Sequence, residues 1–561
     1  MVRPDRKKAT INSALWAGYG DSLGFISELT DERGLLRRLR GGRLTSTVAW
    51  QRQIGGKFGA FVDLPEGCYS DDTQLRLATC RCIRSDGSFD VETFAKVELP
   101  VWLSYALGAG TGTKAAAANL SGQGATWFSN FYAKGTATYF RSGGNGAAMR
   151  IQPHVMSARS LDDPVQILSD VFRNSICTHG HARAIAGAGF HALALAQVVN
   201  TGEIFQPSDW HTFVSQLAIF EDIAHDDPEI STFWLPAWEQ ASNQSFSAAI
   251  QSVQGELLRD IGVIADSLKR NEPQSYALTA ERVNGLDPSL RGAGTTTALL
   301  GMALSWAFQD LGPKDALLIG ARLVGSDTDT NTTLAGAILG ALADTGPDDS
   351  VMDREYLVNE AERLYNVAKG KASSSFVYPD LLGWSPPRNA LDCVGLWNGR
   401  ACLAGICDLE FHGSLFPTRS TGDSGWQWAT LGFGQSVLCK RRIELKELSP
   451  RQYPPSHSFQ AKVASSELKE LHLAFQDKSR DLDLFRDRPK QPSAATTPAA
   501  NSRRTLDEMT NEAIRSGFDP MTIGRHLLEI AERNSEIELG IAYTSIILKA
   551  RKARLNADRG R

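Results

Sequence analysis

The sequence predicts an all-α domain, followed by a small β-rich domain and a C-terminal helical segment. Three observations lead to this fold class: a helical apolar period through residues 1–372, short β-prone runs within 373–460, and a return of the helical period over 504–561. A chain of 561 residues is also too long for one hydrophobic core. Between the last two parts, the composition of 461–503 predicts a helix and then a disordered linker rich in Pro, Ala and Thr.

Apolar residues in the first part recur at the spacing that places them on one face of a helix. After Asp72 this period is visible at Leu75, Ala78, Thr79, Cys82 and Ile83. It recurs at Leu334, Ala337, Ile338 and Ala341, where Gly336 and Gly340 add a second, flat face. Strong alternating strand patterns are nearly absent from this part. The pattern therefore predicts helices that pack at close approach.

The second part changes character after Pro379, where tryptophans and glycines become frequent. Its short β-prone runs are separated by Asn398-Gly399 and by the glycine-bounded turn 422–425. Such turns between apolar runs are typical of hairpins. The last part contains two capping-box patterns, Thr505 with Glu508 and Ser535 with Glu538, which predict a helical hairpin or small bundle.

Composition excludes several classes of protein. The net charge of −4 gives no whole-chain argument for binding nucleic acid or membranes. The eight cysteines have no zinc-ribbon spacing, so reduced thiols are the simpler interpretation. We find no signal-peptide pattern and no run of 18 apolar residues. These features predict a soluble cytoplasmic protein that does not contact membranes.

Two acidic clusters, each at the start of an apolar helix, stand out in the all-α part. The first is Ser70-Asp71-Asp72 and the second is Asp327-Thr328-Asp329-Thr330. Either cluster alone is explained as an ordinary helix cap. Together they offer only hard oxygen ligands, which suit Mg²⁺, Ca²⁺ or Mn²⁺ and are poorly suited to zinc or copper. The pair predicts two facing helix ends that share two metal ions.

Five motifs, in order along the chain, resemble those of the ADP-ribosylglycohydrolases. They are Gly20-Asp21 to Glu28, Tyr69-Ser70-Asp71-Asp72-Thr73-Gln74, Gly144-Asn145-Gly146-Ala147-Ala148-Met149-Arg150, Thr178-His179, and Asp327 to Thr330. The resemblance covers about residues 11 to 345 and leaves out the β-rich and C-terminal parts. It implies an all-α catalytic domain of the ADP-ribosylglycohydrolase type with a dimetal centre.

The resemblance also implies roles for individual residues. Two Mg²⁺ ions, with Mn²⁺ as the alternative metal, are expected to be held by Ser70, Asp71, Asp72, Asp327, Asp329 and Thr330. The catalytic set is Glu28, Asp71, Asp72 and Asp329. Ser70 departs from the family pattern, in which threonine is usual, but it retains the hydroxyl oxygen. Asp21 is expected to cap a helix or support the site through a hydrogen bond.

The ADP-ribose itself is expected to contact Gly144, Asn145, Gly146, Ala147, Met149, His179 and Ser326. Glycines let backbone N–H groups approach an anion, and we expect the segment after Ala147 to present a helix N-terminus to it. Arg150 has two open interpretations, a cation for the diphosphate or a structural partner. We expect the neighbouring His181 and His191 to lie on helix surfaces or in satisfied core positions.

The function that follows is hydrolysis of the C1″ bond between ADP-ribose and a modified acceptor, which reverses ADP-ribosylation. The acceptor is a protein, a nucleic acid or a small metabolite, and the sequence does not decide among them. The alternative is a binding or immunity protein of the same fold that sequesters an ADP-ribosyltransferase or a modified target. A third interpretation assigns nucleic-acid contact to the basic C-terminus, although a solvated helix end, with cations favoured near its C-terminus, explains those charges better.

Overall fold

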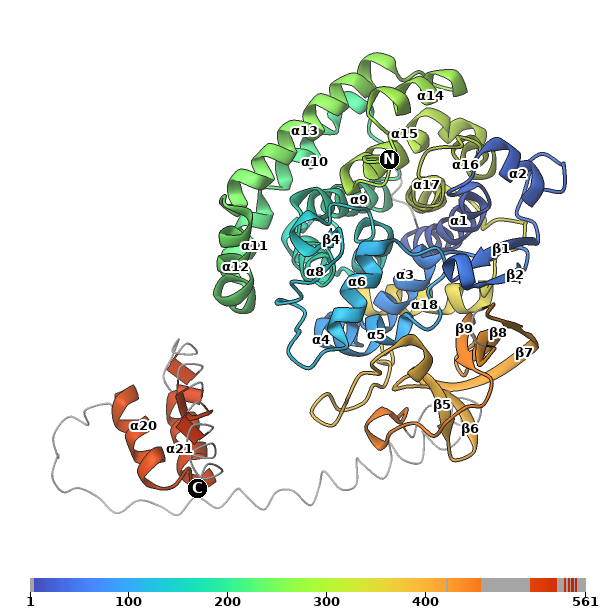
Figure 1. Cartoon of the computed structure of the whole chain (residues 1–561). Coiled ribbons are helices and arrows are strands. Elements are labelled where there is room, and N and C mark those ends of the chain that lie inside the picture. Colours follow the sequence, from blue (N-terminus) through green and yellow to red (C-terminus); the bar gives the residue numbers. More distant parts are fainter. Residues whose placement is uncertain are drawn as a thin grey trace. The chain divides into compact units, whose positions relative to one another are not determined.

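A computed structural model describes residues 5–419, 422–455, 505–531 and, within 539–551, residues 539–540, 543–544, 546–548 and 550–551. The chain divides into two compact units, residues 1–468 and 469–561. The predicted fold class is confirmed: a helix-rich domain is followed by a five-stranded sheet and then by C-terminal helices (Figure 1). The proposed linker, the Ser535–Glu538 box and most of the basic terminus lie outside the described residues.

The first unit is built mainly from helices. Their bounds are α1 (Arg6–Ser27), α2 (Glu32–Arg38), α3 (Asp71–Arg81), α4 (Val91–Thr93), α5 (Leu99–Trp102), α6 (Thr111–Leu120), α7 (Gln152–Ser157), α8 (Pro164–Ile176), α9 (Ala182–Thr201), α10 (His211–Gln216), α11 (Ile219–Asp226), α12 (Leu235–Ser242), α13 (Phe246–Ser267), α14 (Pro273–Arg282), α15 (Gly294–Phe308), α16 (Pro313–Ala321), α17 (Thr328–Leu342) and α18 (Arg354–Ala368). Helices α1, α9, α15 and α17 form the centre of this unit (Figure 1).

The α1–α17 pair depends on glycine. A Cβ atom on Gly20 would lie 2.2 Å from the Thr332 carbonyl oxygen, and one on Gly336 would lie 2.2 Å from that of Trp16. The flat glycine face predicted from the sequence is therefore the face on which the two helices cross. Because of this close approach, the end of α1 and the start of α17 lie side by side, and both carry predicted site residues.

Helix α9 is long and apolar enough to cross a membrane by length and composition. In the fold it is a core helix, since 89% of its apolar window is buried within the protein. It packs against α15 and α8. Its composition therefore reflects its central place in the helical unit.

A short hairpin in the helical part is a departure from the sequence analysis, which expected almost no strands there. It consists of β1 (Trp50–Ile54) and β2 (Ala60–Leu64), which pair antiparallel. Its inward side chains include Arg52 between Trp50 and Ile54, so the apolar alternation is interrupted and the strands were not recognised. A second pair, β3 (Ala133–Lys134) with β4 (Ala137–Thr138), has two residues a strand.

The predicted β-rich region forms an antiparallel meander of β5 (Val394–Trp397), β6 (Arg400–Leu403), β7 (Cys407–Pro417), β8 (Ser424–Leu431) and β9 (Ser436–Arg442). Asn398 and Gly399 link β5 to β6 with φ of 52° and 73°, as a two-residue hairpin turn requires. The boundaries proposed for this domain remain a prediction, because the sheet packs within the same compact unit as the helices.

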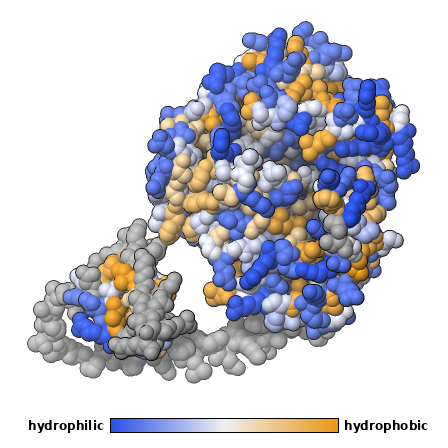
Figure 2. Space-filling view, viewed as in Figure 1, coloured by the Kyte–Doolittle hydropathy of each residue, from blue (hydrophilic) through white to orange (hydrophobic). Residues whose placement is uncertain are grey.

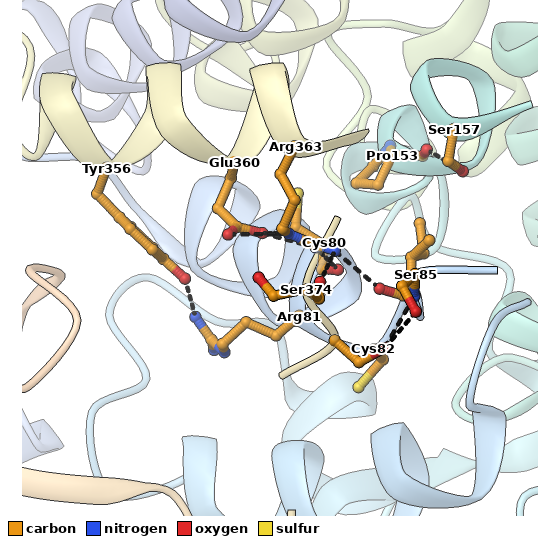
Figure 3. Close-up of polar contacts among 12 residues, drawn as sticks. Cys80, Arg81, Cys82, Ser85, Pro153, Ser157, Tyr356, Glu360, Arg363 and Ser374 are labelled. Carbon is orange, nitrogen blue, oxygen red and sulfur yellow. Dashed lines mark hydrogen bonds and ion pairs between the residues drawn. The ribbon is translucent and has the colours of Figure 1, made fainter. Parts of the chain in front are cut away.

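Buried polar contacts join the sheet to the helices. Arg81, at the end of α3, donates to both carboxylate oxygens of Glu98 and to the side-chain carbonyl of Gln435. It also donates to the Tyr356 hydroxyl of α18 (Figure 3). In the same view Arg363 pairs with Glu360 and reaches the end of α3. Cations near the last carbonyls of a helix are stabilising, so these contacts fix α3 from its C-terminal end.

The C-terminal unit contains α20 (Leu506–Arg515) and α21 (Pro520–Ala531), followed by further helical residues. The Thr505–Glu508 capping box is confirmed, with both of its hydrogen bonds present. Its small core is formed by Met509, Ala513, Phe518, Ile530, Tyr543 and Ile547. Apolar side chains are also exposed on this unit, among them Met521, Leu528 and Leu548 (Figure 2).

Candidate active site

Three helix ends meet at one cavity of about 680 Å³. Helix α3 begins at Asp71, α17 begins just after Asp327, and α1 ends just before Glu28. The cavity is lined by the predicted site residues Glu28, Asp71, Asp72, Asp327, Asp329 and Thr330, and by Gly144, Asn145, Gly146, Met149 and His179. The fold therefore brings the two acidic clusters together with the glycine loop and the histidine.

Asp21 has the supporting role expected for it. Its fully buried carboxylate accepts hydrogen bonds from the backbone N–H groups of Ser70 (2.9 Å) and Thr73 (2.9 Å), and from the Thr73 hydroxyl (2.6 Å). These bonds satisfy N–H groups at the start of α3 that have no partner within the helix. Asp21 thus fixes the first turn of α3, which carries Asp71 and Asp72.

The acidic side chains destabilise one another's ionised forms. Burial raises the pKa of Asp71, Asp72 and Asp329 well above the ordinary value, and neighbouring carboxylates raise each pKa further. One oxygen of Asp72, Oδ2, is buried without a hydrogen-bond partner. Burying a charge without compensation is costly. A cation in the cavity would compensate these groups.

The donor chemistry fits a hard divalent cation. The cluster offers carboxylate oxygens and the Thr330 hydroxyl, the ligand type that Mg²⁺ and Mn²⁺ prefer. Within the described residues, no three His, Cys, Asp or Glu side chains form a closed ligand group as they stand. Binding a cation would therefore require the carboxylates to draw together.

Three predicted residues do not line the cavity. The Ser70 side chain is the N-cap of α3 and accepts from the Asp72 N–H (3.2 Å). Ser326 is buried and donates to the Leu323 carbonyl (2.8 Å). Ala147 is buried behind the glycine loop. In this structure Ser70 supports the site by capping α3, and Ala147 and Ser326 support the loops around it.

The glycine loop is shaped by close contact with His179. A Cβ atom on Gly146 would lie 2.7 Å from both the His179 Cε1 atom and the Thr113 hydroxyl. The expected helix N-terminus after this loop is absent: residues Ala148–Arg150 form only a three-residue 3₁₀ turn. The first α-helix after the loop is α7, which begins at Gln152.

Arg150 has the structural role among the two that the sequence left open. The fully buried guanidinium donates to the Gly146 carbonyl (2.8 Å), to the Asn174 side chain (2.7 Å) and to the Thr178 hydroxyl (2.8 Å). Burial lowers its pKa to about 10, so it stays charged at neutral pH. Arg150 holds the glycine loop from behind and does not line the cavity.

The same network orients His179. The Thr178 hydroxyl accepts from Arg150 and also forms a hydrogen bond with His179 Nδ1 (2.7 Å). The other ring nitrogen, Nε2, lies beside the glycine loop. Burial lowers the pKa of His179 to about 3. His179 is therefore neutral at physiological pH.

Glu28 is held by an ion pair. Its Oε2 atom lies 3.0 Å from Nη1 of Arg52 on the β1 strand. Burial raises the pKa of Glu28, and the neighbouring Arg52 lowers it. The pair was not foreseen because Arg52 lies on a strand that the sequence analysis missed.

Much of the cavity wall was not predicted. It includes residues 108–113, several residues of 136–142, residues 288–293, His181 and Arg183. A signal was present, because Gly108-Ala109-Gly110-Thr111 and Gly292-Ala293-Gly294-Thr295 repeat one motif at the starts of α6 and α15. His181 lines the cavity and caps α9, whereas His191 is buried in the core as expected.

One comparison with known proteins bears on this site, the match to a protein family. Residues 5–372 match the ADP-ribosylglycohydrolase family model. No curated protein matches the sequence. A solved structure described as an "ADP-ribosylglycohydrolase-related protein complex" is 17% identical, with a TM-score of 0.39, and the alignment covers 65% of this chain and 99% of that chain. That likeness is too weak to add to the argument. Because the family match spans most of the chain and contains the whole cavity, the chain belongs to the ADP-ribosylglycohydrolases, a family of hydrolases that act on ADP-ribose linkages.

Proposed function

We propose that the protein is a Mg²⁺-dependent hydrolase that cleaves the bond between C1″ of ADP-ribose and an acceptor. One observation carries the proposal: a single cavity joins an oxygen-only carboxylate cluster to glycine-rich loops and a neutral histidine. A Cβ atom on Gly292 would lie 2.8 Å from Asp327 Oδ2, so these loops lie directly against the carboxylates. A diphosphate on the loops would thus present its ribose to the acidic cluster.

The chain's own residues would bind and orient the substrate. Backbone N–H groups of the glycine loops suit the diphosphate, because glycine lets an anion approach closely. His179 donates from Nε2 to a phosphate or ribose oxygen. Asp71, Asp72, Asp327 and Asp329 would hold two divalent cations, which supply Lewis-acid polarisation of oxygen atoms when bound.

We assign the proton transfer to Glu28. A water oxygen forms the new bond to C1″, and the bond from C1″ to the acceptor breaks with its electron pair on the acceptor. Such cleavages pass through an oxocarbenium-like state. Glu28 takes the proton of the water and returns it to the acceptor. Fixing the groups in one geometry removes much of the entropic part of the barrier.

The test is to incubate the protein with ADP-ribosylated arginine, serine and nucleobase substrates and with O-acetyl-ADP-ribose, with and without Mg²⁺, and to measure free ADP-ribose. We expect release from at least one substrate, its loss in EDTA and its recovery in Mg²⁺. Release that is indifferent to chelation would rule out the metal-dependent form of the proposal.

The second candidate is a binding protein that sequesters an ADP-ribosyltransferase or a modified target. Five of the six proposed ligand positions, all except Ser70, place oxygen-bearing side chains on the cavity wall, which favours an enzyme. Binding of a transferase by a protein that releases no ADP-ribose from any of these substrates would favour the binding role.

We place the protein in the cytoplasm, because all eight cysteines are buried and unpaired, as in a reducing compartment.

A further inference from the structure

The β5–β9 sheet lies beyond the residues that match the family, yet it belongs to the same compact unit as the cavity. We propose that this sheet positions Glu28 by holding the β1–β2 hairpin, whose Arg52 clamps the Glu28 carboxylate. The inference rests on the proposed function in one respect, that Glu28 acts at the active site.

The first link is the clamp itself. The Arg52–Glu28 pair is nearly enclosed, with the two side chains 14% and 13% exposed. The Arg52 guanidinium lies 4.5 Å above the Phe25 ring and 5.9 Å from the Trp50 ring. On α2, Arg38 lies 4.7 Å from the Trp50 ring and donates to the Glu28 carbonyl (2.8 Å). Stacking on aromatic rings holds each arginine in place. Arg52 thus fixes the side chain of Glu28, and Arg38 fixes its backbone.

The second link is the support of the hairpin. Two short strands alone are marginally stable, so the position of Arg52 depends on what packs against the hairpin. Figure 1 shows the hairpin between α1 and the strands β7–β9. The Trp428 Nε1–H of β8 donates to the Asp63 carbonyl (3.0 Å), and the Arg419 N–H donates to the Phe58 carbonyl (3.1 Å). The sheet therefore holds both the second strand and the turn.

A tight contact at the turn completes the link. Gly55 follows β1 with φ of 77°, and a Cβ atom there would lie 2.3 Å from the Trp426 ring. The Lys440 ammonium lies 5.1 Å from the same ring on the neighbouring strand. Only glycine fits between the hairpin and this tryptophan. The contact with β8 therefore fixes the position of the end of β1, the strand that carries Arg52.

The first test measures hydrogen exchange by mass spectrometry in Trp428→Phe, which removes the indole N–H and keeps an aromatic ring. The matched control is Trp384→Phe, which removes an indole bond of the same kind to the Lys96 carbonyl (2.8 Å), away from the hairpin. We expect Trp428→Phe to speed exchange about two- to tenfold in residues 25–35 and 50–64, as loss of one hydrogen bond allows. Trp384→Phe should change neither segment. Equal effects of the two variants, or an effect of Trp428→Phe that stops at the hairpin, would overturn the proposal.

The second test separates positioning from binding. Arg52→Gln should lower kcat on the order of 10- to 100-fold, as expected for a misplaced catalytic group. KM and the calorimetric Kd for free ADP-ribose should stay within about twofold, because the glycine loops are untouched. Arg52→Lys should restore part of kcat. An active wild type with an unchanged kcat in Arg52→Gln contradicts the inference. Failure of the wild type to cleave any substrate contradicts the proposed function instead, and the exchange experiment still decides the role of the sheet.

Discussion

Asp71, Asp72 and Asp329 illustrate how individual residues are prepared for a ligand. Each is almost completely buried beside other carboxylates, and burial raises the pKa of each. Around them, Asp21 fixes the start of α3, and Arg150 fixes the glycine loop and the Thr178 hydroxyl that contacts His179. Asp21 and Arg150 each make three or more hydrogen bonds, whereas Asp72 Oδ2 is buried without a hydrogen-bond partner. That contrast is typical of a binding site.

Asp329→Asn is expected to lower ADP-ribose release on the order of 10²- to 10⁴-fold, because it removes ligand charge while keeping the shape of the side chain. The melting temperature of the metal-free protein should not fall, since the change relieves repulsion among buried carboxylates. Release assays and calorimetry check both points. Asp344→Asn, at an exposed surface carboxylate, is the control. Wild-type turnover by Asp329→Asn in Mg²⁺ would exclude Asp329 as a metal ligand.

His154 predicts a pH dependence of stability. Burial lowers its pKa from 6.5 to about 3. Between these values the unfolded chain binds a proton that the folded protein does not, so stability is full above pH 6.5 and is lost as pH falls toward 3. His154→Gln should reduce this slope by at most about 1.4 kcal/mol per pH unit. Urea unfolding at several pH values measures it. The exposed His211 provides the control variant, and equal slopes in wild type and His154→Gln would contradict the prediction.

At the scale of elements, the site is a meeting of helix ends. The α1–α17 crossing places Glu28 near Asp327 and Asp329, and Asp21 of α1 ties in the start of α3. Glycine makes the crossing possible because the backbones touch without side chains between them. The geometry of the cavity therefore depends on small residues that do not line it.

Gly336→Ala tests this dependence. The added Cβ atom would lie 2.2 Å from the Trp16 carbonyl oxygen, so the helices must separate. We expect a loss of about 1–3 kcal/mol in the free energy of unfolding, as for overpacking in a core. Gly262→Ala in α13 is the matched control, because nothing lies within 4 Å of its Cβ position. There alanine should stabilise the helix by up to about 1 kcal/mol. Equal effects in denaturant unfolding would contradict the packing role.

At the scale of the whole molecule, the family match and the compact unit have different ends. The match stops at residue 372, whereas the compact unit continues to residue 468. Beyond residue 372, Tyr378 donates to Glu98 (2.6 Å) and Gln435 accepts from Arg81 (2.8 Å). These contacts complete a buried ion pair at the end of α3. The sheet is therefore part of the folded hydrolase unit.

Truncation tests this division. A chain ending at residue 455 should keep the melting temperature of the first unit and its hydrolase activity, because the C-terminal unit has its own core. A chain ending at residue 372 should lose stability, since each buried polar group left unpaired costs about 1–3 kcal/mol. Differential scanning calorimetry compares the two. Equal melting temperatures would show that the sheet contributes nothing to the helical part.

The sequence by itself determined the order of helices, sheet and C-terminal helices, and the identity of the acidic residues that converge on the cavity. Periodicity and turn residues such as Asn398-Gly399 are local signals. The two acidic clusters are local as well, because each consists of a few consecutive residues. Only the tertiary structure decided that Arg150 is structural, that Ser70 caps a helix, that Arg52 pairs with Glu28, and that the β5–β9 sheet contacts the β1–β2 hairpin. Those assignments depend on which segments meet in space. Contacts between distant segments leave no local pattern, because they are made by packing and not by neighbours in the chain.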